Sequence, residues 1–146
     1  DRQELKAKQE GYVDLIGGAK LLTPDADDSD LSIKSKAIRS SNNATIQSGS
    51  FVTHRAMINI NNLARELNLD MLPITPWHDC CYYAVHKKDL VEASRIIQAE
   101  MERPFMENQL FPLISKPDIG KSLKGGFEVD TNVEGYEQKI REKFNI

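Results

Sequence analysis

The sequence predicts an α+β fold in which antiparallel β-hairpins pack on helices. Residues 12–22 and 71–85 each contain two short β-favouring runs separated by a tight turn. Residues 44–67 and 89–103 carry apolar residues at three- and four-residue steps, which give a helix one buried face. Hairpins that alternate with such helices favour antiparallel strands with helices on one face.

The composition predicts a globular chain with no membrane span. Its 146 residues suit one domain or a piece of a larger one. No apolar run approaches the roughly 20 residues that a span needs. Cys80 and Cys81 are neighbours that do not suit an ordinary disulfide, so a soluble protein of a reducing, cytoplasmic compartment is expected. The net charge of -3 argues against a free-standing DNA-binding module, unless a partner segment supplies positive charge.

The first part of the chain predicts a short helix, a hairpin and an acidic loop. Residues 2–9 are good helix formers, and residues 12–16 predict a strand. Gly17-Gly18 predicts a tight turn, after which Leu21-Leu22 returns as the second strand. Residues 24–30 (PDADDSD) are typical of a solvated loop.

Two helices are expected next. The first begins at Ser32, where apolar residues recur at helical spacing. The second spans residues 44–67 and is closed by Asn68. Its apolar face consists of Val52, Ala56, Ile60, Leu63 and Leu67.

The second hairpin is expected to be irregular. Residues 71–77 (MLPITPW) and 81–85 (CYYAV) predict its strands, and His78-Asp79 predicts the turn. Proline cannot donate to a sheet ladder, so the first strand should be an edge or an irregular strand.

A helix, a short strand, a loop and a last helix complete the prediction. Asp89, with Glu92 three residues later, predicts a capping-box start for a helix that Pro104 ends. Residues 110–115 predict a short strand, and residues 116–126 predict a loop rich in Lys and Gly. An amphipathic helix ends the chain, with the apolar stripe Val133, Tyr136, Ile140 and Phe144.

One candidate site is a polar stripe on a helix. Arg39, Asn43 and Gln47 are spaced by four residues and share one face of a continuous helix. All three donate hydrogen bonds, which suits the acceptors of the DNA minor groove. The alternative is an ordinary solvated helix face.

The other candidate site is the turn after Trp77. A carboxylate at a hairpin tip, such as Asp79, suits Mg²⁺, which takes few protein oxygens and leaves places for phosphate. Two-metal phosphoryl transfer needs a second carboxylate, which must come from elsewhere. The alternative is an aspartate that stabilises a turn by bonding its own backbone.

Four segments in order resemble family A DNA polymerases. The pattern after Glu10 (EGYVDLIGGAKLLTPD) resembles the stretch that follows the fingers helices, and residues 37–60 resemble the family's Arg-x-x-x-Asn-x-x-x-Gln segment. Residues 77–102 resemble the His-Asp-Glu motif, its strand and its helix, and residues 111–123 resemble the closing strand. The resemblance runs from about Lys8 to Leu123 with matching gaps.

The resemblance implies roles for the candidate residues. Asp79 would bind the catalytic Mg²⁺ ions, and His78 would contact the primer terminus. Arg39, Asn43 and Gln47 would hydrogen-bond the minor groove or backbone near the nascent base pair. The implied partners are primer-template DNA, deoxynucleoside triphosphates and the remaining polymerase segment, in a bacterial or phage-infected cell.

The sequence departs from the family pattern at several positions. Cys80 replaces the motif glutamate, and a thiol cannot replace a carboxylate as a magnesium ligand. Pro73 and Pro76 interrupt a strand that is usually aliphatic, and Leu123 stands where a tryptophan is common. The helix after Val129 has no counterpart. These departures suit a divergent, viral polymerase.

The resemblance divides the chain into three parts. Residues 1–31 would connect fingers to palm, residues 32–127 would form the palm core, and residues 128–146 would add an extra helix. The family's other catalytic aspartate and its nucleotide-gripping fingers helix do not occur in the sequence. We therefore expect a chain that is inactive alone, either as a shortened piece or as one product of a split gene.

Three other interpretations stay open. The chain could be a non-catalytic DNA-binding or assembly module that kept the palm shape. His78, Cys80, Cys81 and His86 could form a zinc cluster, although zinc-binding cysteines usually lie two to four residues apart. A metal-dependent phosphohydrolase would need more His and Asp ligands. Lys116, Lys121 and Lys124 could contact phosphates, and the alternative is that they belong to an ordinary solvated loop.

Overall fold

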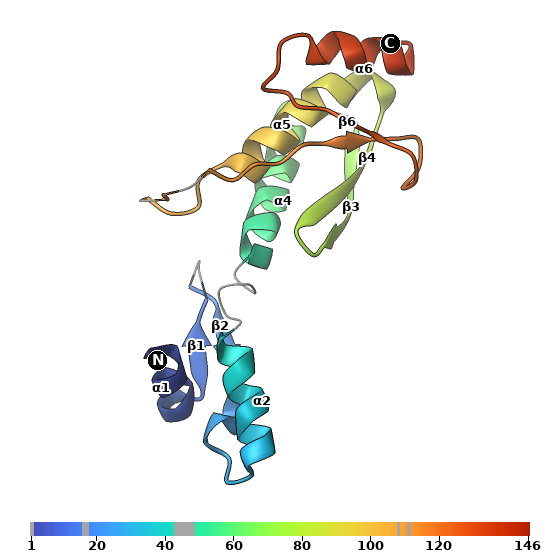
Figure 1. The fold of residues 1–146 in the computed structure, drawn as a ribbon. Coiled ribbons are helices and arrows are strands. Elements are labelled where there is room, and N and C mark those ends of the chain that lie inside the picture. The colour runs from blue at the N-terminus through green and yellow to red at the C-terminus, as the bar shows by residue number, and fades with distance from the viewer. Residues whose placement is uncertain (1, 16–17, 43–48, 108, 111) are drawn as a thin grey trace. The chain divides into compact units, whose positions relative to one another are not determined.

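The computed structural model describes residues 2–15, 18–42, 49–107, 109–110 and 112–146. The chain divides into two compact units, Asp1–Phe51 and Val52–Ile146 (Figure 1). No helix among the described residues is long and apolar enough to cross a membrane. The mixture of helices and small antiparallel sheets confirms the α+β class.

The first unit contains a short hairpin between helices. Its elements are α1 (Arg2–Glu10), β1 (Tyr12–Asp14), β2 (Lys20–Leu22), η1 (Pro24–Asp27) and α2 (Leu31–Asn42). The strands pair antiparallel, with Val13 opposite Leu21. Ala7, Val13 and Ala26 form the buried centre, and Ala37 of α2 packs against it.

The acidic segment of the first unit differs from its prediction. Residues 24–30 are expected to be a loop, but Pro24–Asp27 form a 3₁₀-helix. Pro24 favours this start because its fixed φ suits a first helical turn. Buried Ala26 then ties the segment to the small core, while Asp25 and Asp27 remain exposed.

The second unit carries the longer hairpin. Its elements are α4 (Gly49–Glu66), β3 (Met71–Trp77), β4 (Cys80–Val85), η2 (Lys87–Asp89), α5 (Leu90–Glu102), β5 (Asp118–Ile119), β6 (Phe127–Glu128) and α6 (Tyr136–Phe144). Within the described part of the chain, β3 pairs with β4 and β5 pairs with β6, both antiparallel. The predicted strand at 110–115 is wrong for its described residues, because the pairing strand is β5 further on.

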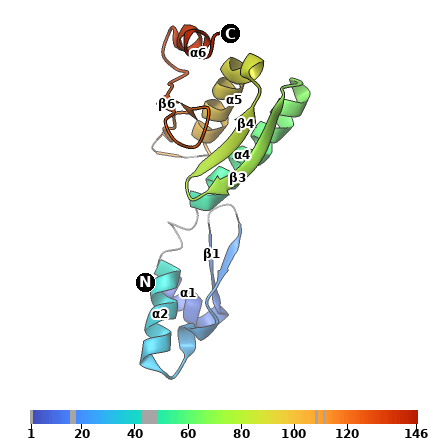
Figure 2. The same ribbon diagram turned by 90° about the vertical axis from the view of Figure 1, so that its right-hand side faces the viewer.

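Helices α4 and α5 pack against one face of the β3–β4 hairpin (Figure 2). Ala56, Ile60 and Ala64 of α4 meet Ala93 and Ile96 of α5 in the main core. The hairpin contributes Met71, together with the inward-facing Cys81, Tyr83 and Val85. Because strand side chains alternate, the neighbouring Tyr82 and Ala84 face away from this core and are exposed.

The irregularity of β3 agrees with the proline argument. The register shifts between Pro73 and Thr75, where the ladder carries a bulge or irregularity. Each proline removes one donor, so a regular ladder with β4 is impossible there.

The start of α5 differs from the predicted capping box. Asp89 lies at the N-cap position but makes no capping hydrogen bond. Its Oδ2 atom instead accepts a hydrogen bond of 2.9 Å from the Asp70 backbone. This carboxylate therefore holds the base of the hairpin rather than the helix terminus.

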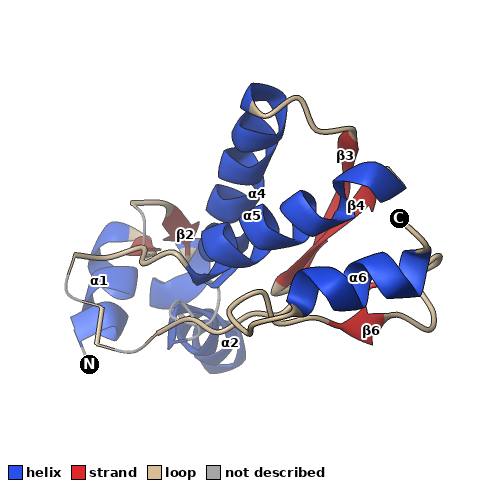
Figure 3. Ribbon diagram, turned by 90° about the horizontal axis from the view of Figure 1, so that it is seen from above, coloured by secondary structure: helices blue, strands red, loops and turns tan. Residues whose placement is uncertain are grey.

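The last helix, α6, is part of the folded core and not a spare element (Figure 3). Ile140 and Phe144 are buried with Leu90, Ile119 and Val129. Val133 was expected in the same stripe, but it lies before the helix and is 51% exposed.

A buried glutamine joins α5 to the turn before α6. Gln98 is 1% exposed, and its Nε2 donates to Asp130 Oδ1 at 2.9 Å and to Glu102 Oε1 at 3.0 Å. Its Oε1 accepts from the Thr131 backbone at 2.7 Å. The hydrogen bonds from Gln98 and from the Asn132 backbone hold the pKa of Asp130 below its ordinary value. Every polar atom of the buried amide thus has a partner.

Candidate catalytic turn and nucleic-acid contacts

The β3–β4 hairpin holds the His78-Asp79 turn away from its anchored base. At the base, Met71 is buried in the main core and pairs with Val85. The His86 backbone donates to Asp70 O at 2.8 Å, which adds to the Asp89 bond described above. At the other end Trp77 pairs with Cys80, so His78 and Asp79 form a two-residue turn. This confirms the predicted position of the turn.

The turn backbone includes a left-handed residue. His78 has φ 53°, which is uncommon for a residue with a side chain. The Cys80 thiol donates to Trp77 O at 3.0 Å and so closes the turn. The Trp77 and His78 rings meet edge-on, with centroids 5.4 Å apart. Both rings are nevertheless exposed to solvent.

The Asp79 carboxylate is exposed to solvent. Among the described residues it has no hydrogen-bond or ion-pair partner. An aspartate that stabilised the turn through its side chain would bond a nearby backbone N–H. The geometry gives no support to that alternative, and it leaves both carboxylate oxygens available for a ligand.

In the part of the chain that the structure describes, the two cysteines are not arranged as a zinc site. Cys81 faces the core, 4.0 Å from Met101 Sδ, and burial raises the pKa of its thiol to about 11. In the described ranges no three His, Cys, Asp or Glu side chains are placed to hold a metal ion. Neither the zinc nor the phosphohydrolase interpretation gains support.

The residues at the turn fit a magnesium ion only in part. Asp79 offers the oxygen ligands that Mg²⁺ prefers. Cys80 offers sulfur, and its thiol already bonds Trp77 O. The turn therefore provides one carboxylate and can complete a metal site only with ligands from another segment.

The predicted polar stripe is only partly described. Arg39 lies on α2, is exposed, and donates to Ser35 Oγ at 3.1 Å. Asn43 and Gln47 lie outside the described residues. Whether the three share one face therefore stays a prediction.

The three loop lysines differ in their surroundings. Lys116 Nζ pairs with Glu128 at 3.1 Å, which raises the pKa of the lysine. Within the described residues, neither Lys121 nor Lys124 has an ion-pair partner. Lys87, which the sequence did not single out, lines the same groove as Lys121. That placement depends on the β5–β6 pairing, for which the sequence carries no local signal.

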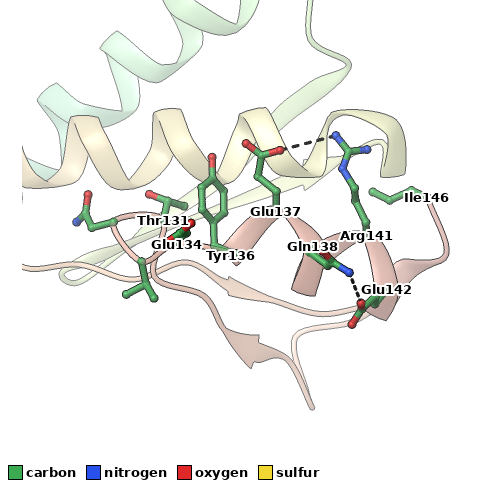
Figure 4. Close-up of a pocket in the computed structure, with 11 residues that line it drawn as sticks. Thr131, Glu134, Tyr136, Glu137, Gln138, Arg141, Glu142 and Ile146 are labelled. Atoms are coloured by element: carbon green, nitrogen blue, oxygen red, sulfur yellow. Dashed lines mark hydrogen bonds and ion pairs between the residues drawn. The ribbon is translucent and has the colours of Figure 1, made fainter.

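One pocket lies on the surface of the last segment (Figure 4). Its volume is about 810 Å³, and residues from Thr131 to Ile146 line it. The Gln138 amide donates to Glu142 at 2.8 Å, and Arg141 lies 4.0 Å from Glu137. The one arginine of the pocket lining thus pairs with a neighbouring glutamate, and none of the predicted site residues lines the pocket.

Comparison with known proteins identifies the class of the chain. The family profile described as DNA polymerase family A matches residues 1–124. The chain therefore belongs to the family A DNA polymerases, as its motifs predict. The matched region contains the Asp79 turn and ends within the 116–126 loop.

A solved structure supports the fold. The POL domain of Pol1 from M. smegmatis, in complex with DNA primer-template and dNTP, matches with a TM-score of 0.64 at 22% identity. The match covers 69% of this chain and 18% of that chain. The chain thus corresponds to a small part of that polymerase.

Proposed function

We propose that the chain forms the C-terminal part of a polymerase palm that adds deoxynucleotides to a primer 3′ end. The single observation that carries this proposal is the exposed, unpartnered Asp79 carboxylate on a firmly anchored hairpin. Family membership over residues 1–124 supports the reaction class. The neighbour solved with primer-template DNA and dNTP supports DNA and nucleotides as partners.

In this proposal Asp79 holds the catalytic magnesium through its carboxylate oxygens. A magnesium pair would neutralise charge that develops on the transferred phosphoryl group. His78, beside it in the turn, would contact the primer terminus. The second carboxylate would come from the remaining polymerase segment, encoded in the same gene or in a split partner, so the chain would be inactive alone.

The polar stripe and the subdomain boundaries belong to the same proposal. Arg39, Asn43 and Gln47 would hydrogen-bond the DNA minor groove or backbone near the nascent base pair. Residues 1–31 would join fingers to palm, residues 32–127 would be palm, and residues 128–146 would be an addition.

A specific observation favours one alternative, a non-catalytic DNA-binding or assembly module. Cys80 provides no oxygen ligand, so the turn retains one carboxylate where the family motif has two. Such a module would bind DNA or a polymerase segment without supporting extension, and extension therefore separates the two functions.

The test is primer extension by the chain combined with the polymerase segment that carries the other catalytic carboxylate. Asp79→Asn should lower the rate about a thousandfold or more, because several kcal/mol of charge stabilisation is lost. Asp25→Asn is the matched control, since it removes the same charge from an exposed aspartate of η1. If the rate of Asp79→Asn is unchanged, Asp79 does not bind the catalytic metal. If the wild-type chain supports no extension, the non-catalytic assembly module is favoured.

A further inference from the structure

The second unit contains a groove that the catalytic proposal does not use. It has a volume of about 590 Å³ and lies between β4 and residues 117–126, with α5 and α6 contributing to its lining. Its apolar lining includes Ile74, Val85, Leu90, Ile119, Leu123 and Phe144. A groove of this size, apolar with a few polar groups, is typical of ligand sites.

Part of the groove lies beyond the family match. Gly126 and Phe144 line it, but the matched region ends at residue 124. The β5–β6 pairing and the docking of α6 place these residues there. The last segment of this chain therefore contributes part of the groove lining.

Two lysines from distant segments line the groove. Lys87 comes from η2 and Lys121 from the loop after β5. Neither has an ion-pair partner in the described residues, whereas the neighbouring Lys88 lies 3.9 Å from Asp89. Two cations that line one groove repel each other, and a bound anion would relieve this repulsion.

The groove lining contains less negative than positive charge. Asp118 is the acidic residue among the lining residues. Its carboxylate packs against Gly126, where an added Cβ would collide with it. One carboxylate against two lysines leaves the groove with excess positive charge, although the chain as a whole has a net charge of -3.

The loop that carries Lys121 is preorganised. A Cβ at Gly120 would lie 3.0 Å from Gly126 Cα, so the two ends of the loop touch. Ser122 Oγ donates to Lys124 O at 2.8 Å and fixes the tip. Leu123 is 84% exposed at this tip, between Lys121 and Lys124. A fixed loop thus presents an apolar side chain between two cations.

Tyr83 also lines the groove, and its side chain packs against the main core. Burial raises the pKa of Tyr83, and its interaction with Cys81 adds to this shift, so the phenol stays neutral. Tyr83 therefore adds no negative charge beside the two lysines.

We propose that this groove binds a single strand of nucleic acid. The phosphates would lie on Lys87 and Lys121, and an unstacked base would pack against Leu123 and Ile74. Single-strand sites combine a positively charged groove with side chains against which the bases pack, which are commonly aromatic; here the exposed aliphatic side chains would take that place. The proposal rests on the proposed function only in its choice of ligand, because a polymerase works on strands with unpaired ends.

The test is binding of a short fluorescein-labelled oligothymidylate to the whole chain, measured by fluorescence anisotropy without metal. Lys87→Gln/Lys121→Gln should weaken binding about tenfold at low salt. It should also reduce the slope of log K against log[salt] by about 1.4, since two phosphate contacts are lost. Leu123→Ser should weaken binding about fivefold with an unchanged slope, because it removes base contact but no charge.

The matched control is Lys36→Gln/Lys139→Gln, which removes the same charge from exposed lysines elsewhere. It should bind like wild type. An equal loss in this control, absence of wild-type binding, or equally tight binding of duplex or polyglutamate would overturn the proposal.

The proposal for the groove and the proposal for the catalytic turn can be tested separately. Asp79→Asn should retain oligothymidylate binding while losing extension. If extension depends on Asp79 but the groove lysines have no effect on binding, only the groove proposal is wrong. If binding follows the prediction but extension does not depend on Asp79, only the catalytic proposal is wrong.

Discussion

At the residue scale, a strained backbone position directly precedes the exposed carboxylate. His78 is held at φ 53° by the Trp77–Cys80 pair and the Cys80 thiol bond. A left-handed conformation costs roughly 1 kcal/mol or more for a residue with a Cβ atom. Such strain persists where the surroundings fix it, and it is frequent at functional sites. The backbone strain at His78 therefore lowers the stability of the hairpin that orients Asp79.

Replacing His78 should reveal this strain. His78→Gly should raise the free energy of unfolding by about 0.5–1 kcal/mol, because glycine adopts positive φ without steric penalty. Urea unfolding followed by circular dichroism measures the change. Asp79→Gly is the control in the same turn, since Asp79 is not among the positive-φ residues. Equal effects of the two substitutions would mean that no strain is stored at His78.

The Cys81 thiol predicts a pH dependence of stability. Its pKa rises from an ordinary 9.0 to about 11 through burial, so the folded state holds the proton more tightly. This contribution to stability is complete below about pH 9 and is lost as pH rises through about 11. Between about pH 8 and pH 10, wild type should lose up to about 1 kcal/mol more than Cys81→Ser. Parallel urea-unfolding profiles for the two proteins would contradict the raised pKa.

At the element scale, the sequence predicted the elements whose position depends on nearby residues. The 71–85 hairpin and its irregularity follow from β-favouring runs and two prolines, and the end of α5 follows from Pro104. The β5–β6 pair was missed because its strands are two residues each and their pairing is set by tertiary packing. The capping box failed because a nearby backbone N–H, that of Asp70, took the Asp89 carboxylate.

The contact between α5 and the last turn is the most testable element-scale interaction. Gln98→Ala should lower the free energy of unfolding by about 1–3 kcal/mol, since it removes the hydrogen bonds between a buried amide and its half-buried partners. Gln138→Ala removes one exposed bond to Glu142 and should change stability by less than about 0.5 kcal/mol. Urea unfolding measures both, and amide exchange at Thr131 should quicken only in the first variant. Similar losses in both variants would show that Gln98 does not hold the turn.

At the scale of the whole molecule, the chain corresponds to a small part of a similar polymerase. It belongs to the family A DNA polymerases, yet its match covers 18% of the similar polymerase chain. The sequence predicted the position of the Asp79 turn because the motif is local. It could not predict the groove beside β4, because Lys87 and Lys121 meet only through the fold. The Arg39 stripe stays a prediction, since Asn43 and Gln47 lie outside the described residues.

The central claim is that an Asp79 oxygen binds the catalytic metal, and thiophilic metal rescue tests it most directly. In the complemented polymerase, Asp79→Cys should lose extension in Mg²⁺ and regain part of it when Cd²⁺ is added, because the soft thiolate binds the softer ion. Asp79→Ala, which still contains Cys80 and Cys81, controls for Cd²⁺ bound by the neighbouring thiols and should stay inactive. Full Mg²⁺-dependent extension by Asp79→Cys, or equal rescue of both variants, would contradict the account.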